Sequence, residues 1–458
     1  MKTHYLIFLS TAVITGLFYE QDFGVNFGLV GVLFGVLTFI KTKKRNRTRE
    51  FMILFVLTMF SSIAFAWYGD FVSFVAVMLS LLFLIFKARN KRMKAILAFP
   101  IMVMNNITFP CRFFDFGKWI PKSQRYQFSF KSFLMLLFPV LFFVVFFMVY
   151  SQGSSLFSEI YLYKLDINIY LLFVICVSFY FSFNYWNFSV AKFYLKRNRF
   201  LQNEFSKNIK NQYFKSFVDF LDLDTERKSG VLTFISLNAL LLIFVITFNY
   251  EQFFGDIQNL SNETHNRVYV VILSIIMAIF ILQFYFKSYF NFDEKAGLLK
   301  KLAKIWIILN GLLVLSAILK NAEYVYNLGL TYKRLGVFAF LVLCIIGLFF
   351  SFKKIQHQKT NIYLYNQMVW YFYGTILVCS FFNWGYFITA YNIHYQKGND
   401  YEFLRNLEYN DSLLLEYFPK EIKNDDFSYR NKIDIMNDEQ AKSFLSKKLY
   451  YEFINTDL

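Results

Sequence analysis

Long apolar runs alternate with short charged segments along the whole chain of 458 residues. A helix needs about 20 apolar residues to cross the hydrocarbon core of a bilayer. The pattern therefore predicts an all-α fold: a polytopic α-helical membrane protein with about eleven transmembrane helices within residues 1–391. We place these spans near residues 4–19, 24–40, 51–67, 71–86, 133–150, 167–185, 231–248, 268–286, 303–319, 335–352 and 364–390.

Two segments leave alternatives open. The run 303–319 is short and starts with a lysine next to its first residue, so it either spans or stays on one side. We expect it to span, because 335–352 and 364–390 both have the length of full spans. The sequence "AILAFPIMVMNNITFPC" (95–111) is too short and too polar for a span, and we expect an interfacial or re-entrant segment.

Composition agrees with the membrane class. Hydrophobic residues make up 57% of the chain and aromatic residues 22%, with a mean hydropathy of +0.40, whereas a soluble chain averages below about 50% apolar. The net charge of +17 would suggest nucleic acid in a soluble protein. Here the sorting of cations in membrane loops accounts for it, so we expect no nucleic-acid partner.

The cations are sorted by loop. With the N-terminus in the cytoplasm, 34 of the 48 Lys and Arg residues fall in cytoplasmic segments, five in outer loops and nine in the tail after residue 391. Cytoplasmic loops carry an excess of Lys and Arg, so this orientation is favoured. An odd number of spans then predicts a multi-pass membrane protein with an extracytoplasmic C-terminus.

The outer loop before 335–352 is an exception to this sorting. It holds three of the five outer cations: Lys320, Lys333 and Arg334. Deep burial of one cation would cost about 2.5–3.5 kcal/mol. We therefore expect Lys333 and Arg334 at the headgroup level or in a polar cavity, with Glu323 as the nearest acid.

A basic stripe lies between two of the predicted spans. In 197–221, apolar residues recur every four positions with lysines between them. This is typical of an amphipathic helix, which would lie against anionic lipid at the cytoplasmic surface. A solvated connector that packs on the protein's own membrane domain is an equally good interpretation.

The last segment, residues 392–458, differs from the rest of the chain; we call it the tail. It has 13 acids against nine bases. We expect an extracytoplasmic helical tail that docks on the membrane domain, because its own core would be thin. "DYEFLRNLEYNDSLLLEYF" predicts two short helices, and "NDEQAKSFLSKKLYYEF" predicts one amphipathic helix with Asn437 and Gln440 at the spacing of a capping box.

Chemistry-bearing residues are rare inside the apolar runs. Asn238 and Asn310 are polar exceptions, and an intramembrane Asn more often joins helices than binds substrate. Glu263 and His265 precede the run 268–286. They would form an acid–base pair, a pH-responsive contact or a helix cap, and we favour the cap.

No motif indicates an enzyme. The chain has no P-loop, GxSxG, HExxH, CxxC or dinucleotide-binding pattern, so we expect no catalytic residue, no cofactor and no metal. The pair Asp222 and Asp224 would allow a divalent cation. We favour a solvated acidic turn at the start of a helix.

Several segments resemble a known family when they are taken together: "SLNALLL", "THNRVYVVILSIIMAIFILQFYFKSYFNF", "YNLGLTYKRLGVFAF" and "ITAYNIHYQKGNDYEFLRNLEYNDSLLLEYF". The chain resembles a family of uncharacterised bacterial polytopic membrane proteins, domain of unknown function four-one-seven-three, with four-one-five-three as a close relative. The resemblance covers roughly residues 220–420. It implies an integral membrane protein without an established activity.

The "GLTYKR" turn is the most specific part of this resemblance. Gly329 would supply a tight turn and Thr331 would cap the following helix. Arg334 would pair with Glu323 or with the tail, in which Asn392 belongs to a matching Y-N motif. We hypothesise that the turn is a latch between the outer ends of the spans and the tail; a lipid headgroup held by Arg334 is the competing account.

These observations favour a non-enzymatic sensor, scaffold or assembly factor, with the bilayer, anionic lipid and a membrane or envelope protein as partners. A transporter or flippase for a neutral or amphipathic cargo is the alternative. A cavity that reaches Asn238 and Asn310 would favour transport, and a packed bundle with a grooved outer face would favour the scaffold. An enzyme acting on lipid-linked sugars would need convergent groups, for which Glu263, His265, Glu323 and Arg334 are the candidates.

Overall fold

The computed structural model describes residues 2–119, 168–205, 222–254, 260–287, 289–423 and 432–454, together with single positions between 139 and 153. Within these ranges the chain is helical, and the only pairing of extended backbone is an isolated bridge between Glu204 and Lys359. The all-α membrane fold class is thus confirmed.

Six helices among the described residues are long and apolar enough to cross a bilayer. They are α3 (Arg49–Tyr68), α4 (Phe71–Arg89), α10 (Ile169–Trp186), α12 (Leu223–Phe254), α14 (Gly297–Leu328) and α15 (Tyr332–Gln356). The run 303–319 lies within α14, which has 32 residues and is therefore long enough for the expected span.

The predicted count of eleven spans is not confirmed. Three of the predicted runs form shorter apolar helices: α1 (Thr3–Phe18), α2 (Val25–Lys41) and the apolar part of α13 (Leu260–Tyr285). The run 133–150 lies outside the described residues, apart from single positions. The segment 95–111 contains α5 (Ala98–Ile107), whose ten residues are too few to cross a bilayer.

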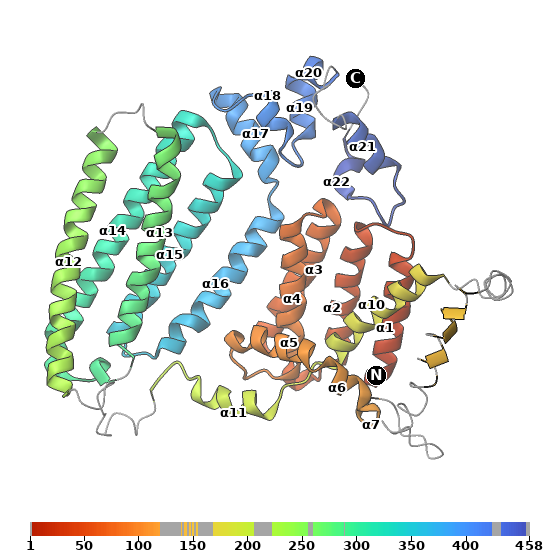
Figure 1. Ribbon diagram of the computed structural model, residues 1–458, viewed down its shortest axis with the longest axis horizontal. Coiled ribbons are helices and arrows are strands. Elements are labelled where there is room, and N and C mark those ends of the chain that lie inside the picture. The colour runs from red at the N-terminus through yellow and green to blue at the C-terminus, as the bar shows by residue number, and fades with distance from the viewer. Residues whose placement is uncertain are drawn as a thin grey trace. The chain divides into compact units, whose positions relative to one another are not determined.

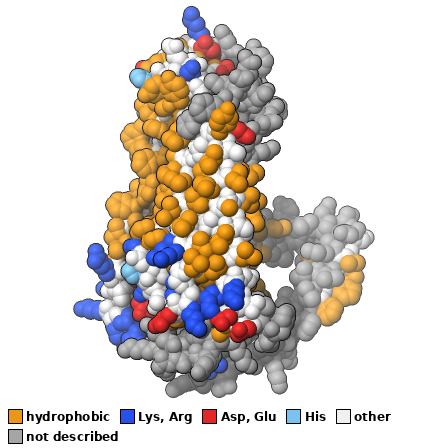
Figure 2. Space-filling view, turned by 90° about the vertical axis from the view of Figure 1, so that its left-hand side faces the viewer, with side chains coloured by type: hydrophobic (Ala, Val, Ile, Leu, Met, Phe, Trp, Pro, Cys, Tyr) orange, Lys and Arg blue, Asp and Glu red, His pale blue; other side chains and the backbone are white. Residues whose placement is uncertain are grey.

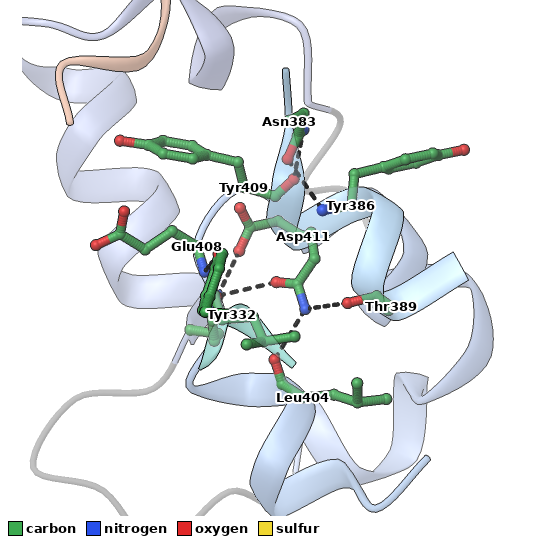
Figure 3. Close-up of polar contacts among 11 residues, drawn as sticks. Tyr332, Asn383, Tyr386, Thr389, Leu404, Glu408, Tyr409 and Asp411 are labelled. Atoms are coloured by element: carbon green, nitrogen blue, oxygen red, sulfur yellow. Dashed lines mark hydrogen bonds and ion pairs between the residues drawn. The ribbon is translucent and has the colours of Figure 1, made fainter. Parts of the chain in front are cut away.

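The prediction of one continuous span over 364–390 is wrong. The chain forms α16 (Asn361–Phe381) and α17 (Trp384–Tyr395), whose axes differ by 67°. Asn383 stabilises the break, because its Oδ1 accepts a hydrogen bond from the N–H of Tyr386 at 2.9 Å and its Nδ2 donates to the carbonyl of Tyr409 at 2.8 Å (Figure 3). An Asn side chain that bonds nearby backbone favours a helix start over a helix interior.

The described helices group into two compact units (Figure 1). Unit 1 comprises residues 1–93, 97–195 and 439–452, and packs α1 on α10 and α2 on α3 on α4. Glycines allow close helix contact there: a Cβ on Gly31 of α2 would lie 2.3 Å from the Oγ of Ser62 on α3. Small residues at such contacts are typical of membrane helix packing.

Unit 2 comprises residues 94–96, 196–438 and 453–458. Its core lies among α12, α13, α14 and α15, with Leu313, Ala317 and Leu341 completely buried. Figure 2 shows a broad belt of hydrophobic side chains on this unit, with Lys and Arg gathered mainly at its lower end. The belt is what a bilayer-facing surface requires.

We call the two ends of unit 2 the tail end and the loop end. The tail end is where α14 turns into α15 and where the tail packs. The loop end is where α15 turns into α16 through residues 357–360. A cluster at the tail end joins Val325, Leu330 and Ile388 of the membrane helices to Leu404 and Leu414 of the tail.

The described residues of the tail form five short helices after α17. They are α18 (Tyr401–Arg405), α19 (Asp411–Tyr417), α20 (Pro419–Lys423), α21 (Lys432–Ala441) and α22 (Leu449–Glu452). The first two occupy the segment in which two short helices are predicted. The tail is divided between the units, since residues up to 438 belong to unit 2 and residues 439–452 to unit 1.

The single amphipathic helix predicted over 437–453 is wrong. Residues 442–448 are not helical, and Asn437 lies inside α21 and therefore caps nothing. The carbonyls of Leu445 and Lys447 instead accept the N–H groups of Asn26 and Val25, at 3.0 and 3.1 Å. The first N–H groups of a helix have no partner within it, so this segment satisfies the start of α2.

The predicted helix over 197–221 also differs from the structure. Helix α11 (Lys192–Phe200) ends early, and residues 201–205 are not helical. The carbonyl of Asn203 accepts the N–H of Thr360 at 3.2 Å, so this stretch pairs with the loop end of unit 2. Residues 206–221 lie outside the described residues.

Candidate functional site

The turn between α14 and α15 has a backbone that requires glycine. Gly329 has φ +83°, in the left-handed region, and a Cβ there would lie 2.5 Å from the carbonyl oxygen of Lys397. Thr331 caps α15, since its Oγ1 accepts the N–H of Arg334 at 3.3 Å. Both residues therefore act through the backbone geometry of the turn.

Asn392 of α17 holds this turn in place. Its side chain is completely buried. The Oδ1 accepts the N–H of Leu330 at 2.6 Å, and the Nδ2 donates to the carbonyls of Leu330 at 3.0 Å and Gly398 at 3.2 Å. One amide thus joins the turn 328–331 to the turn after α17, and all its polar atoms are satisfied.

Arg334 has a partner that the sequence did not indicate. Its guanidinium donates to the carbonyls of Leu328, at 3.2 Å, and Gly329. These are orphan carbonyls at the C-terminus of α14, where the helix dipole is negative and a cation is favourable. A cation is thus favourable at the C-terminus of α14, and this accounts for an arginine in a predicted outer loop, where cations are otherwise rare.

Glu323, one of the two partners expected for Arg334, is therefore not its partner among the described residues. The carboxylate of Glu323 pairs with Lys320 at 3.0 Å, three residues earlier on α14. Residues three apart on a helix are neighbours, so this pair forms without any tertiary contact. The carbonyl of Arg334 in turn accepts the Nδ2 of Asn321 at 3.0 Å, which binds α15 to α14.

A second buried polar cluster lies where the tail meets α17 (Figure 3). The Nδ2 of Asn410 donates to Thr389 Oγ1 and to the carbonyl of Leu404, both at 2.8 Å. Asp411 is 1% exposed and pairs with the Nζ of Lys432 at 2.9 Å. A buried ion pair of this kind is strongly destabilised when one partner is removed.

Asn410, Asp411 and Lys432 are not among the site residues expected from the sequence. The signal for the first two was the "EYNDSLLLEYF" stretch, in which Asn and Asp directly precede a short apolar helix. Lys432 carries no local signal, because it contacts Asp411 across 21 residues of chain.

A groove opens beside this frame at the tail end of unit 2. It has a volume of about 730 Å³. It is formed by α14, α15 and α17, and its lining residues are Leu319, Ala322, Glu323, Val325, Tyr326, Phe338 and Tyr391. The groove thus combines aromatic side chains with one acid, and the turn held by Asn392 fixes its walls.

The two intramembrane asparagines lie elsewhere, on α12 and α14. The Nδ2 of Asn238 on α12 donates to the carbonyl of Leu302 on α14 at 3.1 Å, and that of Asn310 donates to Trp306 of its own helix at 2.8 Å. Asn238 therefore joins two helices. The Oδ1 atoms of both residues have no hydrogen-bond partner among the described residues.

The residues proposed from the sequence do not all converge. Gly329, Thr331, Arg334 and Asn392 come together at one turn. Asn238 contacts α14 at Leu302, about 40 Å along the helix from Leu328 at 1.5 Å per residue. Glu263 and His265 belong to the first turns of α13, and their side chains lie outside the described residues.

A comparison with known families matches most of the chain. The family described as "Domain of unknown function (DUF4153)" matches residues 50–416, from the start of α3 to the end of α19. The chain belongs to the DUF4153 family. The resemblance in the sequence had put domain of unknown function four-one-seven-three first, and the match corrects it to the relative.

Membership in DUF4153 carries no biochemical activity with it. The matched part of this DUF4153 chain contains the α14–α15 turn, Asn392, Asn410 and Asp411, whereas Lys432 lies beyond it. None of the curated proteins and none of the solved structures compared matches the chain. The function of this DUF4153 protein must therefore be argued from its own site.

Proposed function

We propose that this DUF4153 protein is a non-enzymatic scaffold or assembly factor of the bacterial inner membrane, with a cytoplasmic N-terminus and an extracytoplasmic tail. The distribution of cations supports this orientation, since 34 of 48 fall in the segments assigned to the cytoplasm. In this orientation the tail end of unit 2 faces the cell envelope.

The observation that carries the proposal is the groove of about 730 Å³ at that end. Tyr326 in its lining is 71% exposed, beside Tyr391 and Glu323. Exposed aromatic residues next to a charge are the usual anchors of protein interfaces. The partner expected here is an envelope protein segment that presents an apolar side chain and a cation to Glu323.

A crosslinking experiment tests this proposal. A photoreactive amino acid at Tyr326 should give one defined protein adduct in cells, and the E323K substitution should abolish it. The matched control is the same amino acid at Leu315, also on α14 and 51% exposed in the apolar belt, which should crosslink to lipid. Equal protein adducts at both positions, or an adduct insensitive to E323K, would contradict the proposal.

Labelling in intact cells tests the orientation. In a cysteine-free background, Glu402→Cys on α18 should react with a membrane-impermeant maleimide. Arg92→Cys, in the loop after α4, should react only after permeabilisation. The reverse pattern would place the groove in the cytoplasm and exclude an envelope partner.

Transport is the second candidate, and one observation favours it. The Oδ1 atoms of Asn238 and Asn310 and the Nε1 of Trp306 are buried without partners among the described residues. Such atoms would suit a polar cargo or water within the bundle. Proteoliposomes that carry a lipid or sugar flux reduced at least about tenfold by N310L would favour transport over the scaffold.

A further inference from the structure

The proposed function rests on the groove of unit 2, and a different pocket lies within unit 1. It has a volume of about 370 Å³, which is in the range of small-molecule sites. Its lining comes from α1, α2, α4 and α10 and from the connection between α1 and α2. None of the described residues that line it is charged. Because an unpaired charge is costly in apolar surroundings, the pocket suits a neutral ligand.

Four phenylalanines in the lining form a continuous row of rings. The ring centroids are 5.2 Å apart for Phe18 and Phe23, and 6.1 Å apart for Phe23 and Phe27. The ring of Phe74 follows at 5.0 Å from that of Phe27. These are the separations of favourable aromatic pairs, so a flat unsaturated ring in the pocket would extend the row.

Helix α10 contributes a second row of lining residues, which are Tyr170, Val174 and Ser178. They recur every four positions and therefore share one face of the helix. Ser178 is the tenth residue of α10, about 14 Å along the helix from its start. In a helix that crosses the bilayer, this position lies within the hydrocarbon core.

The hydroxyl of Ser178 has no protein partner in the described part of the chain. The residue is 2% exposed and makes no hydrogen bond there. Ser182, one turn later on the same face, is completely buried, and its Oγ has no partner among the described residues either. By contrast, the buried Ser80 of α4 donates to the carbonyl of Ala76 at 2.6 Å. Since buried polar atoms are nearly always hydrogen-bonded, a free hydroxyl in the lining of a pocket indicates a ligand with a hydrogen-bonding oxygen.

The pocket opens on an exposed face of α10. Phe173 and Val177, which belong to its lining, are 64% and 50% exposed. Helix α10 is long and apolar enough to cross a bilayer, so this face meets lipid tails. A ligand that is dissolved in the hydrocarbon core therefore enters the pocket without passing through water.

We propose that this pocket binds a lipid-soluble quinone. The flat unsaturated ring packs on the row of phenylalanines, and one ring carbonyl accepts a hydrogen bond from the hydroxyl of Ser178. The apolar side chain of the quinone leaves past Phe173 and Val177 into the bilayer. A phospholipid acyl chain would fill the same volume, but it would leave the hydroxyl of Ser178 unsatisfied.

Calorimetric titration of the purified full-length protein with methylnaphthoquinone tests the hydrogen bond. The S178A variant should bind this probe about two- to tenfold more weakly than the wild type, because one neutral hydrogen bond is lost. Methylnaphthalene, which has the same rings without the carbonyls, should bind both proteins equally. The matched control is S80A, which removes a buried hydroxyl outside the lining and should bind methylnaphthoquinone like the wild type. Equal affinity of the wild type and S178A for methylnaphthoquinone would overturn the proposal.

A cavity-filling variant tests the location of the ligand. S178L adds carbon atoms to open volume, so it should fold and should no longer bind methylnaphthoquinone. Unchanged binding to S178L would place the quinone elsewhere and reject this pocket. The pocket would belong to acyl chains instead if a saturated phospholipid raised the Tm of the wild type but not of S178L, while methylnaphthoquinone had no effect on either protein.

Discussion

Two buried polar side chains at opposite ends of unit 2, Asn392 and Lys354, differ in how they are satisfied. At the tail end, the amide of Asn392 satisfies three backbone groups and is satisfied by them. At the loop end, Lys354 is 2% exposed and has no side-chain hydrogen bond or ion pair with the described residues, and the buried Oδ1 atoms of Asn361 and Asn366 have no hydrogen-bond partner among them. A complete network specifies a structure. We therefore infer that Asn392 specifies the structure of the tail end.

The largest effect is expected from N392A. It leaves the N–H and carbonyl of Leu330 and the carbonyl of Gly398 unsatisfied in a buried position, at a cost of about 3 kcal/mol. Denaturant unfolding in detergent would measure the loss, and limited proteolysis should cleave the tail faster. The control is N406A, since Asn406 is exposed and bonds only the carbonyl of Glu402. Equal effects of the two substitutions would contradict the role of Asn392.

Alanine substitutions at Gly329 and Gly336 should have opposite effects on stability. G329A should destabilise by about 1–3 kcal/mol, because φ is +83° and the new Cβ would clash with Lys397. G336A, on α15, adds a Cβ that meets nothing within 4 Å. It should stabilise by about 0.5–1 kcal/mol, as alanine does in a helix. Thermal unfolding of both variants measures this, and destabilisation by both would refute the special geometry of the turn.

Arg334 should contribute less to stability than Asn392 or Gly329, and its contribution should not depend on Glu323. R334Q removes the cation from the C-terminus of α14 and should cost about 1 kcal/mol. E323Q should have a smaller effect, because its pair with Lys320 is partly exposed. In a double-mutant cycle the two losses should add. A coupling energy well above about 0.5 kcal/mol would instead restore the pair between Arg334 and Glu323.

The smallest effect concerns the loop end. The hydrogen bond from Lys359 lowers the pKa of the Glu204 carboxyl from its ordinary 4.5. A lowered pKa gives stability that is present above the ordinary value and is lost as the pH falls through the lowered one. The Tm of the wild type should therefore fall slightly more than that of E204Q in acid. Parallel curves for the two proteins would show that this exposed pair contributes nothing.

The structural features that could be predicted from the sequence depend on residues that are close together in the chain. An apolar run forms a helix, and nine of the eleven predicted runs overlap single helices of the described residues. The run 364–390 is divided between α16 and α17, and 133–150 lies outside the described residues apart from single positions. Gly329 and Thr331 could be assigned because a turn and a cap depend on a few adjacent residues. Asn392 was a candidate only through its place in the matching Y-N motif.

The structural features that could not be predicted depend on contacts between residues that are far apart in the chain. The break at Asn383 depends on Tyr409, and the non-helical stretch 442–448 forms because its carbonyls satisfy the start of α2. In the sequence, Lys354 looks like an ordinary lysine that follows a predicted span. Its burial depends on tertiary packing, which no local pattern at residue 354 records.

The most direct test of this comparison is the unfolding free energy of two variants, N392L and K354M, in the same lipid-free detergent. Both replace a buried polar side chain with an apolar one. We predict that N392L is destabilised by about 3 kcal/mol, because satisfied backbone partners lose their bonds. We predict that K354M is stabilised by about 1 kcal/mol or more, because an uncompensated charge is removed. Destabilisation of both variants to a similar extent would contradict the account.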